Sequence, residues 1–117
     1  MRIYNATRNT LRGLTGAAKN EPALRQEIVV LALAVPVGLA VAPSAGWYVA
    51  MIGALLMLVT VELLNTAIEK LADRVTLKRD SKIGLVKDIG SAAVFCALCL
   101  AGLVWLAALA VRFDLIR

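Results

Sequence analysis

A stripe of polar side chains interrupts the otherwise apolar sequence VELLNTAIEKLADR, residues 61–74. In a helix that turns about 100° per residue, Glu69 falls about 20° to one side of Glu62, and Asp73 falls about 20° to the other. Asn65 flanks the same stripe. Carboxylate and amide oxygens are ligands for hard cations such as Mg²⁺, and a carboxylate can also act as a general base. The spacing therefore predicts one chemically active face on a largely apolar helix.

Two other polar segments can contribute to the same site. NEPALRQE places Glu21 and Arg25 one helical turn apart. KDIGS places Lys87 and Ser91 one turn apart, with Asp88 beside them. Together these side chains suit a cation and a phosphate, because oxygen ligands hold Mg²⁺ and an ammonium binds phosphoryl oxygens. The spacing alone also allows a simpler interpretation, in which these helix ends pair with lipid headgroups and with one another.

The composition predicts that the elements carrying these residues lie in a membrane. Apolar residues make up 61% of the 117 residues, and the mean hydropathy is +0.81. Soluble proteins contain roughly 45–50% apolar residues, and a small soluble domain has too much surface to bury more. Residues 1–27 hold no apolar run long enough for a signal peptide. We therefore predict a single integral-membrane domain over residues 1–117.

Three spans follow from the lengths of the apolar runs. The uncharged run 28–61 would form a helix roughly 51 Å long. A bilayer core is roughly 30 Å thick, so the proline, serine and glycine of residues 43–46 are expected to divide the run into two helices. A third uncharged run, residues 89–111, is long enough to span alone.

The predicted fold class is an all-α membrane protein with three transmembrane helices preceded by an amphipathic surface helix. Asn20 is expected to cap the first span. The surface helix is expected at about residues 3–19, and the spans at about residues 22–42, 47–71 and 87–111.

The basic residues orient these spans. The net charge is +5, and basic residues gather before the first span and between residues 70 and 87, whereas residues 42–46 carry no charge. By the positive-inside bias, the N-terminus and the 70–88 segment are cytoplasmic and the 42–46 turn is external. Because the basic residues act as topology signals, we expect no nucleic-acid partner.

Depth in the membrane separates the carboxylates of the stripe. Counted from the expected start of the second span, Glu62 lies about 22 Å along the helix and Glu69 about 33 Å. In a core of roughly 30 Å, Glu62 is just inside the cytoplasmic boundary, where an acidic group is costly and usually functional. Glu69 and Asp73 have the alternative interpretation of solvated residues paired with Lys70 or Arg74.

Cys96 and Cys99 form a CxxC pair, a spacing that can indicate metal or redox chemistry. The pair lies within an apolar run, and the sequence has no second pair and no histidine. We interpret the two cysteines as small buried hydrophobic residues. The sequence also lacks GxxxxGK[ST], HEXXH and GxSxG, the familiar motifs of soluble nucleotide-binding proteins and hydrolases.

The segments VELLNTAIEKLADR, NEPALRQE and KDIGSAAV together resemble the prokaryotic diacylglycerol kinase family. The resemblance implies a homotrimeric helical bundle in the bacterial inner membrane. It also implies an enzyme that phosphorylates diacylglycerol to phosphatidic acid with Mg²⁺ and ATP, at the cytoplasmic side.

The resemblance further implies roles for individual residues. Glu62 corresponds to the family's catalytic base, and Glu21 and Glu69 correspond to the glutamates that hold Mg²⁺ at the nucleotide. The remaining positions match the nucleotide site (Arg2, Asn65, Lys87 and Asp88) or, together with Glu62, the lipid site (Glu27 and Ser91).

Two features depart from the family pattern. The link TLKRDSKIGL lacks the acidic, aromatic and histidine residues that contact nucleotide in some members, so adenine recognition there has no assigned side chain. The surface helix lacks the tryptophans of some relatives.

Two alternative functions remain open. A second branch of the family phosphorylates undecaprenol, although RQE after NEPAL and GSAAV after KD are more similar to the diacylglycerol branch. A small proton-coupled transporter belongs to a different class. Three spans and an interfacial Glu62 count against it, since transporters favour midplane sites and repeated halves.

Overall fold

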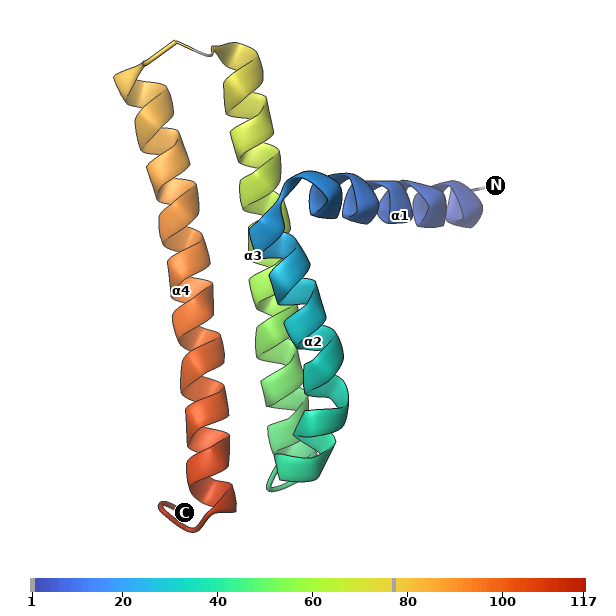
Figure 1. Ribbon diagram of the computed structural model, residues 1–117, viewed down its shortest axis with the longest axis vertical. Helices are drawn as coiled ribbons and strands as arrows, with labels where there is room; N and C mark the ends of the chain where they lie inside the picture. The colour runs from blue at the N-terminus through green and yellow to red at the C-terminus, as the bar shows by residue number, and fades with distance from the viewer. Residues whose placement is uncertain (1, 77) are drawn as a thin grey trace.

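The computed structural model describes residues 2–76 and 78–117. Within them the chain forms four helices: α1 (Arg2–Asn20), α2 (Pro22–Val41), α3 (Ala45–Val75) and α4 (Ser81–Arg112). The last three run side by side, and α1 leaves them roughly at a right angle (Figure 1). The predicted fold class, a surface helix followed by three membrane-spanning helices, is confirmed by this arrangement.

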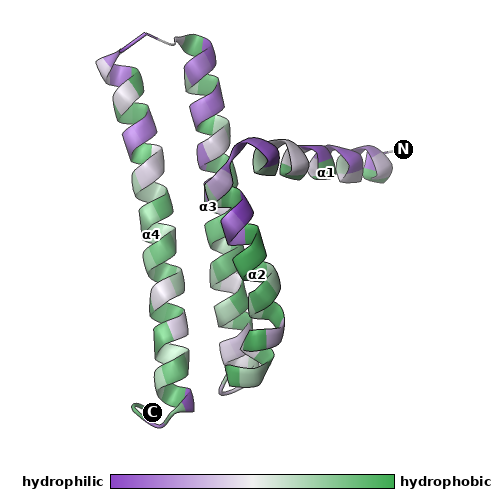
Figure 2. Cartoon of the chain, viewed as in Figure 1, coloured by the Kyte–Doolittle hydropathy of each residue, from purple (hydrophilic) through white to green (hydrophobic). Residues whose placement is uncertain are grey.

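The three helices of the bundle are long and apolar enough to cross a membrane. Their large apolar side chains point outward, and Leu33, Val49, Leu103 and Leu106 are 61–70% exposed. Such a surface suits lipid or another protein chain rather than water. Figure 2 shows hydrophobic residues along most of the bundle and hydrophilic ones on α1 and at the linked ends of α3 and α4.

Helix α3 is the centre of the bundle, because α2 and α4 each pack mainly against it and only slightly against each other. The buried apolar cluster is built largely from small residues: Ala34, Ala54 and Ala101 with Leu55. Small side chains let helices approach closely where no water drives them together. The separation of α2 from α4 leaves room for a groove between them.

The turn between α2 and α3 is short, as the break at residues 43–46 predicts. The Ser44 side chain accepts a hydrogen bond from the backbone N–H of Trp47 at 3.3 Å and so caps α3. Across the hairpin, the Tyr48 hydroxyl donates to the carbonyl of Val35 at 3.0 Å. The Tyr48 ring lies against Gly38, where an added β-carbon would come within 3.0 Å of the ring. This glycine therefore allows the close approach of the two helices.

Two helix starts differ from the prediction. Asn20 does not cap α2, because it is the last residue of α1 and its side chain donates back to the Gly16 carbonyl at 3.2 Å. Glu21 takes the N-cap position instead. Helix α4 begins well before residue 87, since the Asp80 carboxylate accepts from two backbone N–H groups and caps it at Ser81.

The interpretation of Cys96 and Cys99 as buried residues was wrong. Both are exposed in the single chain. The reason is that α4 packs mainly against α3 alone, so most of its circumference has no neighbour within the chain.

Candidate active site

The polar stripe of α3 faces inward at its centre. Glu62 and Asn65 are each 8% exposed, Thr66 is also buried, and Glu69 is half-buried. The Asn65 side-chain amide donates to Glu69 Oε1 at 3.0 Å. A hydrogen bond to a carboxylate is stronger than one between neutral groups. Asn65 therefore orients the Glu69 carboxylate one turn further along the helix.

Helix α4 approaches this stripe at Gly90. Gly90 is buried, and a β-carbon added there would overlap Asn65 Oδ1 and lie 3.2 Å from Asn65 Cγ. Within the described residues, Asn65 Oδ1 is buried without a hydrogen-bond partner. Sequence reasoning missed Gly90, although a glycine inside a helical segment is a sign of close backbone approach.

Helix α2 brings two further glutamates to the site. Glu21 lies at its N-cap but makes no capping hydrogen bond through its side chain, so its carboxylate is available to other partners. The charges of Glu21 and Glu69 act on Glu62, and the charge of Glu62 acts on Glu27. The structure thus brings four carboxylates from two helices within electrostatic range, and we call these residues the acidic cluster.

The surface helix sets the level of this cluster. Helix α1 projects away from the bundle (Figure 1), and a groove between α1 and α3 is lined on the α3 side by Leu63, Thr66, Ala67 and Lys70. An Arg25 guanidinium nitrogen donates to the carbonyls of both Ala18 and Lys19 at 3.0 Å, which ties the end of α1 to α2. A helix of this amphipathic kind lies in the membrane interface. Glu62 directly precedes Leu63 of this groove, so we expect it at the level of the interface.

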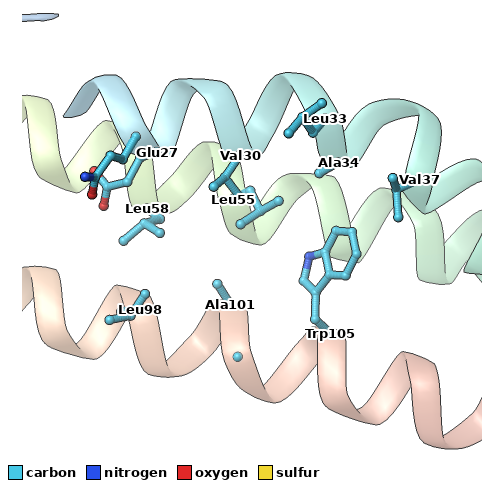
Figure 3. A pocket seen from close by; sticks show the side chains of 12 residues that line it. Glu27, Val30, Leu33, Ala34, Val37, Leu55, Leu58, Leu98, Ala101 and Trp105 are labelled. Atoms are coloured by element: carbon cyan, nitrogen blue, oxygen red, sulfur yellow. The ribbon is translucent and has the colours of Figure 1, made fainter. Parts of the chain in front are cut away.

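An apolar groove of about 670 Å³ runs away from the acidic cluster between α2 and α4. Glu27 lies at one end of this α2–α4 groove and Trp105 towards the other (Figure 3). The Trp105 indole N–H donates to the Met51 carbonyl at 3.0 Å, which fixes the ring against α3. Glu27 Oε2 is buried and has no hydrogen-bond partner in the described part of the chain. The groove thus offers a polar acceptor at one end and hydrocarbon contacts along the rest.

The residues of KDIGS fall on different faces of α4. The Lys87 ammonium donates to Asp73 Oδ1 on α3, whereas Asp88 and Ser91 are exposed. The alternative pairing of Asp73 with Lys70 or Arg74 is therefore wrong.

Arg2 lies at the far end of α1, away from the bundle (Figure 1). A single chain thus does not bring Arg2 to the acidic cluster. The roles implied for individual site residues stay predictions.

The donor set suits Mg²⁺ bound together with a phosphate. Among the described residues, no group of three or more histidine, cysteine or acidic side chains has the arrangement of a metal site. Glu21 and Glu69 supply two carboxylates. Mg²⁺ usually takes one or two carboxylates and completes its shell with water and substrate phosphates, so the residues present fit it.

Taken together, these features define an all-helical integral-membrane protein with three candidate spans, an acidic cluster and an apolar groove that Glu27 of this cluster lines at one end. The chain belongs to the prokaryotic diacylglycerol kinase family, whose sequence model it matches over residues 8–109.

Named relatives agree with this assignment. A diacylglycerol kinase of Haemophilus influenzae is 38% identical over 103 residues, which cover 88% of this chain and 87% of the relative. A diacylglycerol kinase of Pseudomonas aeruginosa is 40% identical over 104 residues, covering 89% and 85%. The diacylglycerol kinase of Escherichia coli is 38% identical over 104 residues, which cover 89% of this chain and 85% of the relative.

Proposed function

We propose that this protein transfers the γ-phosphoryl group of ATP to the free hydroxyl of diacylglycerol, at the cytoplasmic face of a bacterial inner membrane. The observation that carries the proposal is Glu62, a buried carboxylate of the acidic cluster whose charge acts on Glu27 at the end of the α2–α4 groove. We place Glu62 at the depth of the membrane interface. A lipid hydroxyl lies at this depth, just below the headgroups. Membership of the diacylglycerol kinase family supports the same reaction.

Glu62 acts as the general base. Its carboxylate takes the proton of the lipid hydroxyl while that oxygen attacks the γ-phosphorus. The bond between the γ-phosphorus and the bridging oxygen breaks, and ADP leaves with that electron pair. A base inside the hydrocarbon boundary meets the hydroxyl where water is scarce, so hydrolysis of ATP is disfavoured.

The other residues hold the two substrates. Glu21 and Glu69 would hold Mg²⁺, whose chemistry is to neutralise phosphate charge during transfer. Asn65 keeps the Glu69 carboxylate oriented. Lys87 and Asp88 belong to the nucleotide site, and the lipid's polar groups contact Glu27 and Ser91.

The assembly is a homotrimer. The outward apolar side chains of all three bundle helices offer surface for packing between chains. Arg2 projects away from its own acidic cluster. A nucleotide contact by Arg2 is therefore made in the site of a neighbouring protomer.

The experiment is phosphorylation by the purified protein in lipid–detergent micelles, with Mg²⁺, ATP labelled at the γ-phosphate, and diacylglycerol or undecaprenol as parallel acceptors. We expect labelled phosphatidic acid as the main product. Faster labelling of undecaprenol would assign the chain to the other branch of the family. A proton-coupled transporter would label neither lipid.

A further inference from the structure

Within residues 2–76 and 78–117, an ion pair between Asp73 and Lys87 joins the cytoplasmic ends of α3 and α4. Its side chains are 49% and 39% exposed, respectively. Exposed ion pairs of this kind contribute little to stability. The pair therefore contributes little to the stability of the helix packing. Its main effect is to fix the position of the Lys87 ammonium.

The register of the two helices shows how far Lys87 reaches. Gly90 lies against Asn65, and the two helices run in opposite directions. Lys87 precedes Gly90 by about one helical turn, so its backbone is about level with Glu69, which follows Asn65 by one turn. Asp73 lies a further turn towards the cytoplasm. The Lys87 side chain thus extends from about the level of Glu69 towards the cytoplasmic end to reach Asp73.

Two carboxylates of α3 therefore follow one another from the level of Lys87 towards the cytoplasmic end of the helix. Glu69 is bound by the Asn65 amide, and Asp73 holds Lys87. An ammonium has three donors, so one bond to Asp73 leaves two for other acceptors. A bond from Lys87 to Glu69 would instead compete with the cation for that carboxylate.

We propose that Asp73 is a positioning residue that keeps Lys87 away from Glu69. With Lys87 held outward, the Glu69 carboxylate is free to bind the cation, and the ammonium faces the phosphate-bearing side of the site. This inference rests on the proposed function, because it concerns the site of Mg·ATP.

The substitution Asp73→Asn tests this role. We expect it to raise the KM for Mg·ATP, whereas a simple charge effect would lower this KM. Removing a negative charge near the triphosphate would by itself favour the anionic nucleotide. If Asp73 acts through Lys87, however, the KM for Mg·ATP rises by about tenfold, the scale of one lost charge-assisted hydrogen bond. The Mg²⁺ concentration for half-maximal rate also rises, while the KM for diacylglycerol stays unchanged.

Three further variants make the test specific. Asp73→Glu keeps a carboxylate on the same face and is expected to restore most of the nucleotide affinity. Asp114→Asn removes the same charge at the opposite end of the molecule, at a positive φ of 61° that asparagine tolerates, and is expected to change neither KM. In a cycle with Lys87→Gln, the Asp73→Asn effect should disappear once the lysine is gone, because the two residues act as one unit.

The outcomes separate this inference from the proposed function. Absence of lipid kinase activity in the unmodified protein would count against the function itself. An active Asp73→Asn enzyme with unchanged or lower KM for Mg·ATP overturns the inference, as does an effect that adds fully to that of Lys87→Gln. Thermal unfolding in detergent checks each variant, and Asp73→Ser serves as the second substitution if Asp73→Asn does not fold.

Discussion

The Asn65 side chain packs directly against the backbone of Gly90 at the contact between α3 and α4. The Asn65 amide oxygen lies where a β-carbon at Gly90 would have to be, and the amide nitrogen of the same side chain holds Glu69 at 3.0 Å. One helix contact therefore controls both the spacing of the helices and the orientation of a proposed Mg²⁺ ligand.

The first prediction follows from this contact. Gly90→Ala forces Asn65 to move, and overpacking of this kind costs about 1–3 kcal/mol. We expect a lower unfolding midpoint in a detergent denaturation series and a loss of kinase activity greater than the loss of folded protein. Gly84→Ala is the matched control, since nothing lies within 4 Å of its added β-carbon. Alanine there is expected to be neutral or slightly stabilising. Equal behaviour of the two variants would contradict the packing described here.

The second prediction concerns Glu62. Glu62→Gln keeps the shape of the side chain and removes the proposed base, so kcat should fall by about 10²–10⁴-fold, the usual effect of losing a general base. Trimer formation and Mg·ATP binding should survive, because neither depends on proton transfer. Size-exclusion chromatography and nucleotide-binding calorimetry measure these separately from turnover. Wild-type kcat in the folded variant would exclude Glu62 as the base.

Glu69→Gln provides the third prediction. The glutamine side chain still accepts a hydrogen bond from Asn65 but loses the charge that we propose holds Mg²⁺. We expect the Mg²⁺ concentration for half-maximal rate to rise by at least about tenfold, with the KM for diacylglycerol nearly unchanged. A magnesium titration at fixed ATP measures the shift. An active variant with an unchanged Mg²⁺ requirement would show that Glu69 is not a ligand.

The fourth prediction is topological. In a Cys96→Ala/Cys99→Ala background, a cysteine at Ser44 should react with a membrane-impermeant thiol reagent from outside spheroplasts, and one at Arg79 should not. The background substitutions are needed because both native thiols are exposed on α4. Labelling of Ser44→Cys only after lysis would contradict the three-span orientation.

The helices were predictable from the sequence because bilayer thickness fixes how long an apolar run can be. The turn at Pro43 and Ser44 follows for the same reason. The start of a helix outside the membrane depends on local capping instead. Asp80 caps α4, so this helix begins at Ser81, in a polar segment that has no apolar run to predict it. The assignment of Asn20 as a cap failed because α1 continues through it almost to α2.

The candidate site was partly predictable. Helical spacing placed Glu62 and Glu69 on one face, and the sequence also named Glu21 as a contributor, whose charge acts on Glu62 in the structure. The contact of Gly90 with Asn65 and the pairing of Lys87 with Asp73 depend on the register between α3 and α4. That register is set by how the two helices pack against each other. The residue pattern of either helix alone does not specify it.

The separation of α2 from α4 has a consequence for how the rate should be measured. The α2–α4 groove is lined mostly by apolar side chains of the candidate spans, so we expect an acyl chain to enter it sideways from the bilayer without passing through water. The effective substrate concentration is then the mole fraction of diacylglycerol in the surrounding lipid or micelle. Added inert detergent should slow the reaction by surface dilution even when the amounts of enzyme and diacylglycerol in the tube are constant.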